Sequence, residues 1–164
     1  MVVAGTLRLP RGARDELGLA GMSQVDSLSV MNRLLAILYR SLPMYLHDAQ
    51  PWRGKKDERA ASVLDLICQE QGSLANRVAQ YILDHGGQPE PGDYPRAFSD
   101  ANWHFVGLHY LIRPLIEHQQ ADVERIARCV ADLHTDRAAR VLAEEALGAA
   151  KAHLEMLEEL AGSE

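Results

Sequence analysis

The sequence has little cysteine: its 164 residues include only Cys68 and Cys129, far apart and outside any C-x-x-C pattern. This argues against a disulfide scaffold or a zinc knuckle and favours a reducing compartment, so we expect a cytoplasmic protein. A chain of this length buries roughly 70% of its unfolded surface. We therefore expect one domain that folds without a disulfide or a structural metal ion.

Long apolar runs and basic clusters are also missing. No apolar run approaches the ~20 residues of a membrane-spanning helix, so no membrane insertion is expected. The formal net charge is -6, with acids and bases mixed along the chain. Because no basic stripe is present, nucleic acid is not an expected partner. The sequence also lacks strand-like alternation, internal repeats and low-complexity tracts, which predicts an all-α fold.

The first residues, MVVAGTLRLPRGARDELGLAGM, differ from the rest of the chain. Their apolar start is too short for a signal peptide, and Arg8, Arg11 and Arg14 follow the apolar part instead of preceding it. We expect an irregular N-terminal arm over residues 1–23 and one helical domain over residues 24–164.

Four segments carry apolar residues at three- and four-residue steps, the pattern of one helix face. They cover about residues 26–47, 58–85, 99–133 and 136–161. Pro43 should kink or break the first segment and Pro114 should bend the third, because proline removes a backbone donor. The second segment ends at Gly86 and Gly87, followed by Pro89. The connections predict an antiparallel four-helix bundle with one long crossover between the second and third helices.

Three stretches of the chain carry a family resemblance: MNRLLAILYRSLPMYLH, RVAQYILDHGGQP and AHLEMLEEL. They resemble the ferritin-like superfamily, nearest in style to bacterioferritin and rubrerythrin domains, over about residues 31–160. Bacterioferritins have a similar asparagine-led leucine run, an isoleucine-leucine stretch ending in glycine-x-proline, and a histidine before a leucine-rich end. The resemblance implies a ferritin-like bundle, whose di-iron centre takes a Glu from two helices and Glu-x-x-His from the other two.

The first two segments depart from that ligand pattern. The first segment has acids only at its ends, Asp26 and Asp48, and leucines at its core positions. In the second segment, alignment on the glycine-x-proline end places Gln71 and Leu74 at the Glu-x-x-His positions. Bacterioferritin's haem ligand is a methionine directly after the segment's Glu, and its counterpart here is Gly72, so no haem is expected.

The other two segments also depart from the pattern. In the third, the helical phase of about 100° per residue selects Gln119. In the fourth, His153 faces inward, but the residue three before it is Ala150 instead of Glu. The resemblance therefore implies a degenerate di-iron site.

Gln71, Gln119 and His153 are polar residues on otherwise apolar stripes. Two amides and a neutral imidazole can satisfy one another without an ion, and the Tyr45 hydroxyl could join them. Amides are poor ligands for iron or zinc. We expect a polar core cluster of these four residues, with no catalytic residue, no metal and no cofactor. The expected protein is a non-catalytic interaction or structural module of unknown role.

An alternative alignment gives a reduced metal site. Sliding the second segment by one residue pairs Glu70 with Ser73, and counting back from His153 selects Glu117 in the third segment. Glu70, Glu117 and His153 would hold one iron, manganese or zinc ion, for ferroxidase, iron-handling or peroxide-defence chemistry. The apolar periodicity points both carboxylates away from the core, which disfavours this alternative.

The fourth segment carries a second apolar stripe, formed by Leu147 and Leu154 with Ala150 between them. A second apolar stripe on a bundle usually contacts a helical partner. We expect a homodimer through Leu147 and Leu154.

Overall fold

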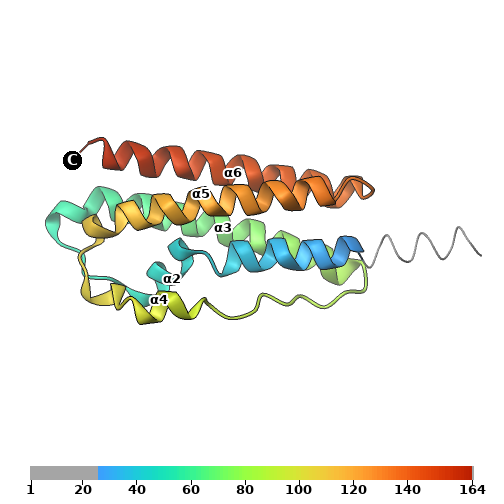
Figure 1. Ribbon diagram of the computed structural model, residues 1–164, viewed down its shortest axis with the longest axis horizontal. Coiled ribbons are helices and arrows are strands. Elements are labelled where there is room, and N and C mark those ends of the chain that lie inside the picture. The colour runs from blue at the N-terminus through green and yellow to red at the C-terminus, as the bar shows by residue number, and fades with distance from the viewer. Residues whose placement is uncertain (1–25, 164) are drawn as a thin grey trace, which may run out of the picture.

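The computed structural model describes residues 26–163, and over this range the protein consists of helices joined by turns and loops (Figure 1). The predicted all-α class is confirmed. A helix over residues 26–39 precedes α2 (Leu42–Ala49), η1 (Lys55–Asp57), α3 (Glu58–Asp84), α4 (Arg96–Asp100), η2 (Trp103–Phe105), α5 (Leu108–Asp132) and α6 (Arg137–Ala161). None of these helices is long and apolar enough to cross a membrane. The N-terminal arm expected over residues 1–23 lies outside the described residues.

The first predicted segment is divided at Pro43, as expected. The helix over residues 26–39 ends in a turn, and Pro43 lies in the first turn of α2, where its missing N–H removes no helical hydrogen bond. Ser41 is the N-cap of α2, and its Oγ accepts a hydrogen bond from the Met44 N–H at 3.4 Å. The division therefore places a polar side chain in the core, where Ser41 is only 2% exposed.

The third predicted helix starts later than expected. It was placed from about residue 99, but α4 ends at Asp100, Asn102 has a left-handed φ of 51°, and α5 begins after Gly107. The Leu108 N–H donates to the Trp52 carbonyl at 3.2 Å, which ties the start of α5 to the loop before α3. Pro114 does not end α5, which runs as one helix from Leu108 to Asp132.

The long helices lie side by side along the molecule (Figure 1). α5 and α6 form an antiparallel hairpin, whereas α3 and α5 run in the same direction. The segment between α3 and α5 returns along the helix over residues 26–39. Asn32 holds this segment, donating to the Gln88 carbonyl at 3.0 Å and accepting from the Glu90 N–H at 2.8 Å.

Two apolar clusters fill the interior. One joins the helix over residues 26–39 to the second halves of α3 and α5 and the first half of α6. The other joins α2 and α4 to the first halves of α3 and α5 and the end of α6. Between the clusters lies a group of buried polar residues, which we call the polar layer: Ser41, Gln71, Gln119, Asp122 and His153.

Candidate functional site

Gln71 enters the polar layer from α3, two helical turns from Leu64 and from Val78, which are buried on the same face. It is 3% exposed, and the Ser41 hydroxyl donates to its Oε1 at 2.8 Å. Because Ser41 also accepts from the first turn of α2, its hydroxyl serves as donor and acceptor at once. Gln71 therefore connects α3 to the start of α2.

Gln119 connects the other pair of helices. It is fully buried on α5, and its Nε2 donates to the Ala150 carbonyl of α6 at 3.0 Å. A carbonyl only accepts, so this contact fixes which end of the amide faces α6. Within residues 26–163, Gln119 Oε1 has no hydrogen-bond partner.

His153 is fully buried on α6, and its Nε2 lies 2.7 Å from Oε2 of Glu70 on α3. Since a carboxylate only accepts, Nε2 carries the proton of this hydrogen bond. His153 Nδ1 has no partner in the described part of the chain, and in a neutral imidazole of this tautomer it is an acceptor.

The three polar residues expected in the core, Gln71, Gln119 and His153, are thus buried in one layer. Their hydrogen bonds go to Ser41, Ala150 and Glu70, respectively. The expectation that they satisfy one another is not met among the described residues, because each finds a partner on another element. With a neutral imidazole, Gln119 Oε1 and His153 Nδ1 are both acceptors and cannot bond to each other.

Tyr45 is partly buried on α2, and its neighbours are aromatic. Its ring centroid lies 5.3 Å from that of Tyr94, edge to face, and 5.5 Å from that of Phe98. Such pairs stabilise by about 0.5–1.5 kcal/mol beyond their buried area. Tyr45 therefore packs α2 against α4 and the residues just before it, a packing role separate from the polar layer.

The alternative metal ligands do not come together. Glu70 contacts His153, but the Glu117 side chain is 67% exposed and lies 3.7 Å from Arg113 on the surface of α5. Among the described residues, no three His, Cys, Asp or Glu side chains are arranged to hold a metal ion. At the three positions that the resemblance singled out, Gln71, Gln119 and His153 offer two amides and one imidazole, a donor set that does not fit the di-iron centre implied by the resemblance.

Asp122 belongs to the polar layer but was missed from the sequence. Its carboxylate is 2% exposed and is hydrogen-bonded to the Arg125 guanidinium. Burial raises the pKa of this carboxyl to about 6, and Arg125 opposes part of the rise. Val123, which is apolar and lies four residues after Gln119, fits an inward line in the sequence, whereas the three-residue spacing from Gln119 to Asp122 is the signal for the buried carboxylate.

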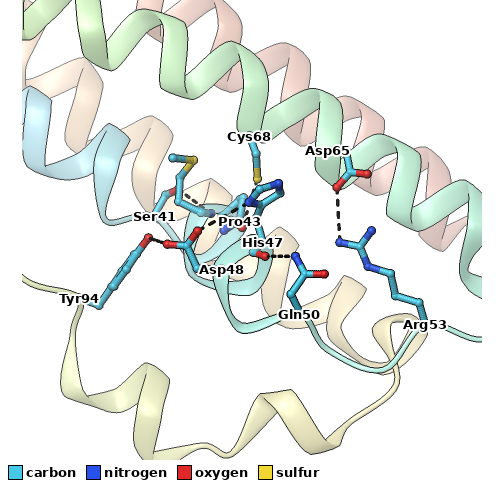
Figure 2. A network of polar contacts seen from close by, with 10 residues as sticks. Ser41, Pro43, His47, Asp48, Gln50, Arg53, Asp65, Cys68 and Tyr94 are labelled. Carbon is cyan, nitrogen blue, oxygen red and sulfur yellow. Dashed lines mark hydrogen bonds and ion pairs between the residues drawn. The ribbon is translucent and has the colours of Figure 1, made fainter.

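Polar contacts around α2 hold it in place (Figure 2). The Cys68 thiol donates to the Pro43 carbonyl at 3.3 Å, and the Tyr94 hydroxyl donates to Asp48 at 2.9 Å. Burial, with smaller effects of Asp65 and Asp48, raises the pKa of Cys68 to about 12. Cys68 is therefore a packed thiol and not a nucleophile.

The outer stripe expected on α6 is shorter than predicted. Ala150 is 2% exposed and lies in an apolar cluster, so its assignment to the outer stripe is wrong. The helical phase turns it inward, because it lies one turn from the buried Ala146 and from His153. Leu147 and Leu154 are partly buried.

Comparisons of the chain with protein-family models, with curated protein sequences and with solved structures find no match.

Proposed function

We propose that the chain is a ferritin-like four-helix bundle in which the polar layer stands in place of a di-metal centre. It would act as a non-catalytic interaction or structural protein. One observation carries this proposal: Gln71 and Gln119, at the positions aligned with metal-ligating glutamates, are buried and hydrogen-bonded within the chain. The parallel course of α3 and α5 supports the ferritin-like connection (Figure 1).

The physical reason is the charge at positions 71 and 119. Glutamates at these two positions would be buried carboxylates that need a cation to offset their repulsion and lost hydration. Amides carry no charge, and a hydroxyl and a backbone carbonyl satisfy them here. A layer built in this way aligns four helical elements without a metal ion.

A second candidate is the one-ion metalloprotein, and the contact between Glu70 and His153 is the observation that favours it. A metal ion there would replace this hydrogen bond and would need further ligands. The cavity beside Glu70, about 230 Å³ in volume, is also lined by Arg77 and Glu145. These two side chains bind each other at 2.8 Å, so a cation would meet the guanidinium of Arg77.

Metal-dependent melting separates the two candidates. Protein stripped with a chelator is melted alone and with sub-millimolar manganese, zinc or, without oxygen, ferrous iron. We expect the melting temperature to stay the same, because only a ligand that binds the folded state raises it. A clear rise that Glu70→Gln abolishes, with one tightly bound ion per chain by elemental analysis, would reject the non-catalytic proposal in favour of the metalloprotein.

The partner that we propose is a second copy of the chain. Leu147 and Leu154 are two helical turns apart on α6 and both remain partly exposed. They would form the centre of a helix–helix contact between two bundles.

A further inference from the structure

A cavity of about 470 Å³ opens between the helix over residues 26–39, the returning segment and α5. Four arginines line it: Arg33 from the first helix, Arg40 from the turn that ends this helix, and Arg125 and Arg128 from α5. Between the arginines, the two helices contribute small or apolar side chains, Ala36, Ile37 and Cys129. We call this cavity the arginine groove.

Helical periodicity explains why the arginines converge. Arg125 and Arg128 are three residues apart and share one face of α5. Arg40 is seven residues after Arg33, and its N–H still donates to the Ala36 carbonyl at 2.9 Å, so it continues the helical phase and lies on the same side as Arg33. The two faces meet only in the folded chain. The groove therefore gathers guanidinium groups in a protein whose formal net charge is -6.

The third wall of the groove is held in place. Asn32 fixes the returning segment at Gln88 and Glu90, and Arg40 Nε donates to the Gly92 carbonyl at 2.6 Å. The Arg40 guanidinium also lies 4.8 Å from the centre of the Tyr94 ring. A ligand that enters the groove would meet a preformed wall, which lowers the entropic cost of binding.

The arginines keep donors for a ligand. Arg33 binds Asp132, and Arg125 binds Asp122. Arg128 lies 3.9 Å from Glu124, and the side chains of this last pair are 74% and 73% exposed. Each guanidinium has five N–H donors, and these contacts engage one nitrogen of each. One acid, Asp93, lines the groove itself. The acids that pair with Arg33, Arg125 and Arg128 are not among the residues that line the groove, so a ligand in it meets more arginines than acids.

We propose that the arginine groove binds a small organic oxyanion, with a carboxylate or phosphate group carried on an apolar body. The planar guanidinium fork matches both groups bidentately. The apolar side chains between the arginines would cover the body of the ligand, and the volume falls within the roughly 300–1,000 Å³ of small-molecule sites. This binding function goes beyond the proposed structural role and does not depend on it.

Methyl NMR of the full chain with labelled isoleucine tests the proposal. Ile37 lines the groove. Ile67 lies in the apolar cluster of α2 and α4, away from the groove, and its signal is the internal control. The probes are phenyl phosphate, hexanoate and inorganic phosphate. We expect a saturable shift of the Ile37 signal with phenyl phosphate or hexanoate, and the probe that binds tighter identifies the oxyanion. Inorganic phosphate should bind more weakly, since it has no apolar body.

Two matched variants assign the binding to the groove. Arg128→Gln removes a groove arginine and should weaken binding about tenfold, as expected for a charge-assisted hydrogen bond. Arg113→Gln removes an arginine of the same helix that is 91% exposed and pairs with Glu117 outside the groove, so it should leave binding unchanged. Arg33→Gln is a second groove variant, and circular dichroism checks that each variant is folded.

Three results would overturn the proposal. The first is an Ile37 signal that neither organic probe shifts. The second is inorganic phosphate binding as tightly as phenyl phosphate, which would mean an adventitious ion only. The third is equal weakening by Arg128→Gln and Arg113→Gln, which would mean a general charge effect that salt screens.

Discussion

The imidazole Nε2 of His153 lies 2.7 Å from the carboxylate Oε2 of Glu70, and the two side chains differ sharply in exposure, at 1% and 48%. A fully buried ring on α6 is thus hydrogen-bonded to a half-exposed acid on α3. The alternative reading of the sequence placed these two residues together as metal ligands. Their contact does not require a metal ion, because the buried Nε2–H of His153 needs an acceptor and the Glu70 carboxylate provides it.

Glu70→Ala should therefore lower the free energy of unfolding by about 1–2 kcal/mol, since the buried Nε2–H loses its acceptor. Glu70→Gln should cost less, because the amide oxygen still accepts. Urea denaturation measures both changes. Glu155→Ala, at an exposed glutamate of α6, is the control and should change stability little. Equal losses for Ala and Gln at position 70 would show that the hydrogen bond is not the cause.

Asp122 predicts a pH dependence of stability. Burial raises the pKa of its carboxyl in the folded state from its usual value of 3.8 to about 6. Between about pH 4 and 6 the folded state binds this proton more than the unfolded state does, so stability falls as the pH rises through that window. The loss from this group is about 3 kcal/mol.

Asp122→Asn should remove that slope, because asparagine resembles the protonated acid. Above pH 7 the variant should be more stable than the wild type, as measured by urea denaturation at several pH values. Asp132→Asn, which changes a half-exposed acid that binds Arg33, should keep the slope. Parallel curves for Asp122→Asn and the wild type would contradict the prediction.

Two glycines of opposite environment give a stability test. A Cβ on Gly72, inside α3, meets no atom within 4 Å, so Gly72→Ala should stabilise by about 0.5–1 kcal/mol through helix propensity. A Cβ on Gly87 would lie 2.9 Å from Ile82 Cγ2 and 3.1 Å from Leu28 Cδ2. Gly87→Ala should therefore destabilise by about 1–3 kcal/mol. Thermal melting compares the two, and a gain at position 87 would contradict the expected clash.

Periodicity and proline chemistry predicted the all-α class and the division of the first helical segment. The break at Pro43 and the buried position of Gln71 both follow from local rules, namely a missing donor and the helical phase. The late start of α5 was not predictable in this way, because it depends on the left-handed Asn102 and on a hydrogen bond to the distant Trp52.

The candidate sites also divide into those that local sequence rules predict and those that depend on tertiary contacts. The buried amides could be found on single helices. The arginine groove could not, because Arg33 and Arg128 lie on different helices and meet only through tertiary packing. Asp122 was missed since an apolar neighbour, Val123, fits the inward pattern almost as well.

The dimer has a direct test. Leu154→Lys should lower the apparent mass in solution from dimer to monomer with little loss of helicity, because a charge in an apolar contact must be desolvated. Light scattering and circular dichroism provide the two measurements. Ala152→Lys adds the same charge at an exposed position of α6 and should leave the mass unchanged. A monomeric wild type would end the idea.

The last prediction concerns the charge of the polar layer. Gln71→Glu combined with Gln119→Glu buries two carboxylates, which lose hydration and repel each other. At pH 8 we expect a loss of about 3 kcal/mol or more in the free energy of unfolding. The folded state raises the pKa of these acids, so the stability of the double variant should rise as the pH falls towards that value.

The matched control uses the same helices. Gln69→Glu with Gln120→Glu places two carboxylates at exposed neighbouring positions, where hydration is kept and little stability should be lost. Manganese or ferrous iron should rescue the buried double variant only slightly, because Leu74 occupies the position that the proposed ferritin-like alignment gives to a histidine, and the first helix offers leucines. A large metal-dependent rescue would mean that the layer retains the geometry of a metal centre, and that only its charge has been lost.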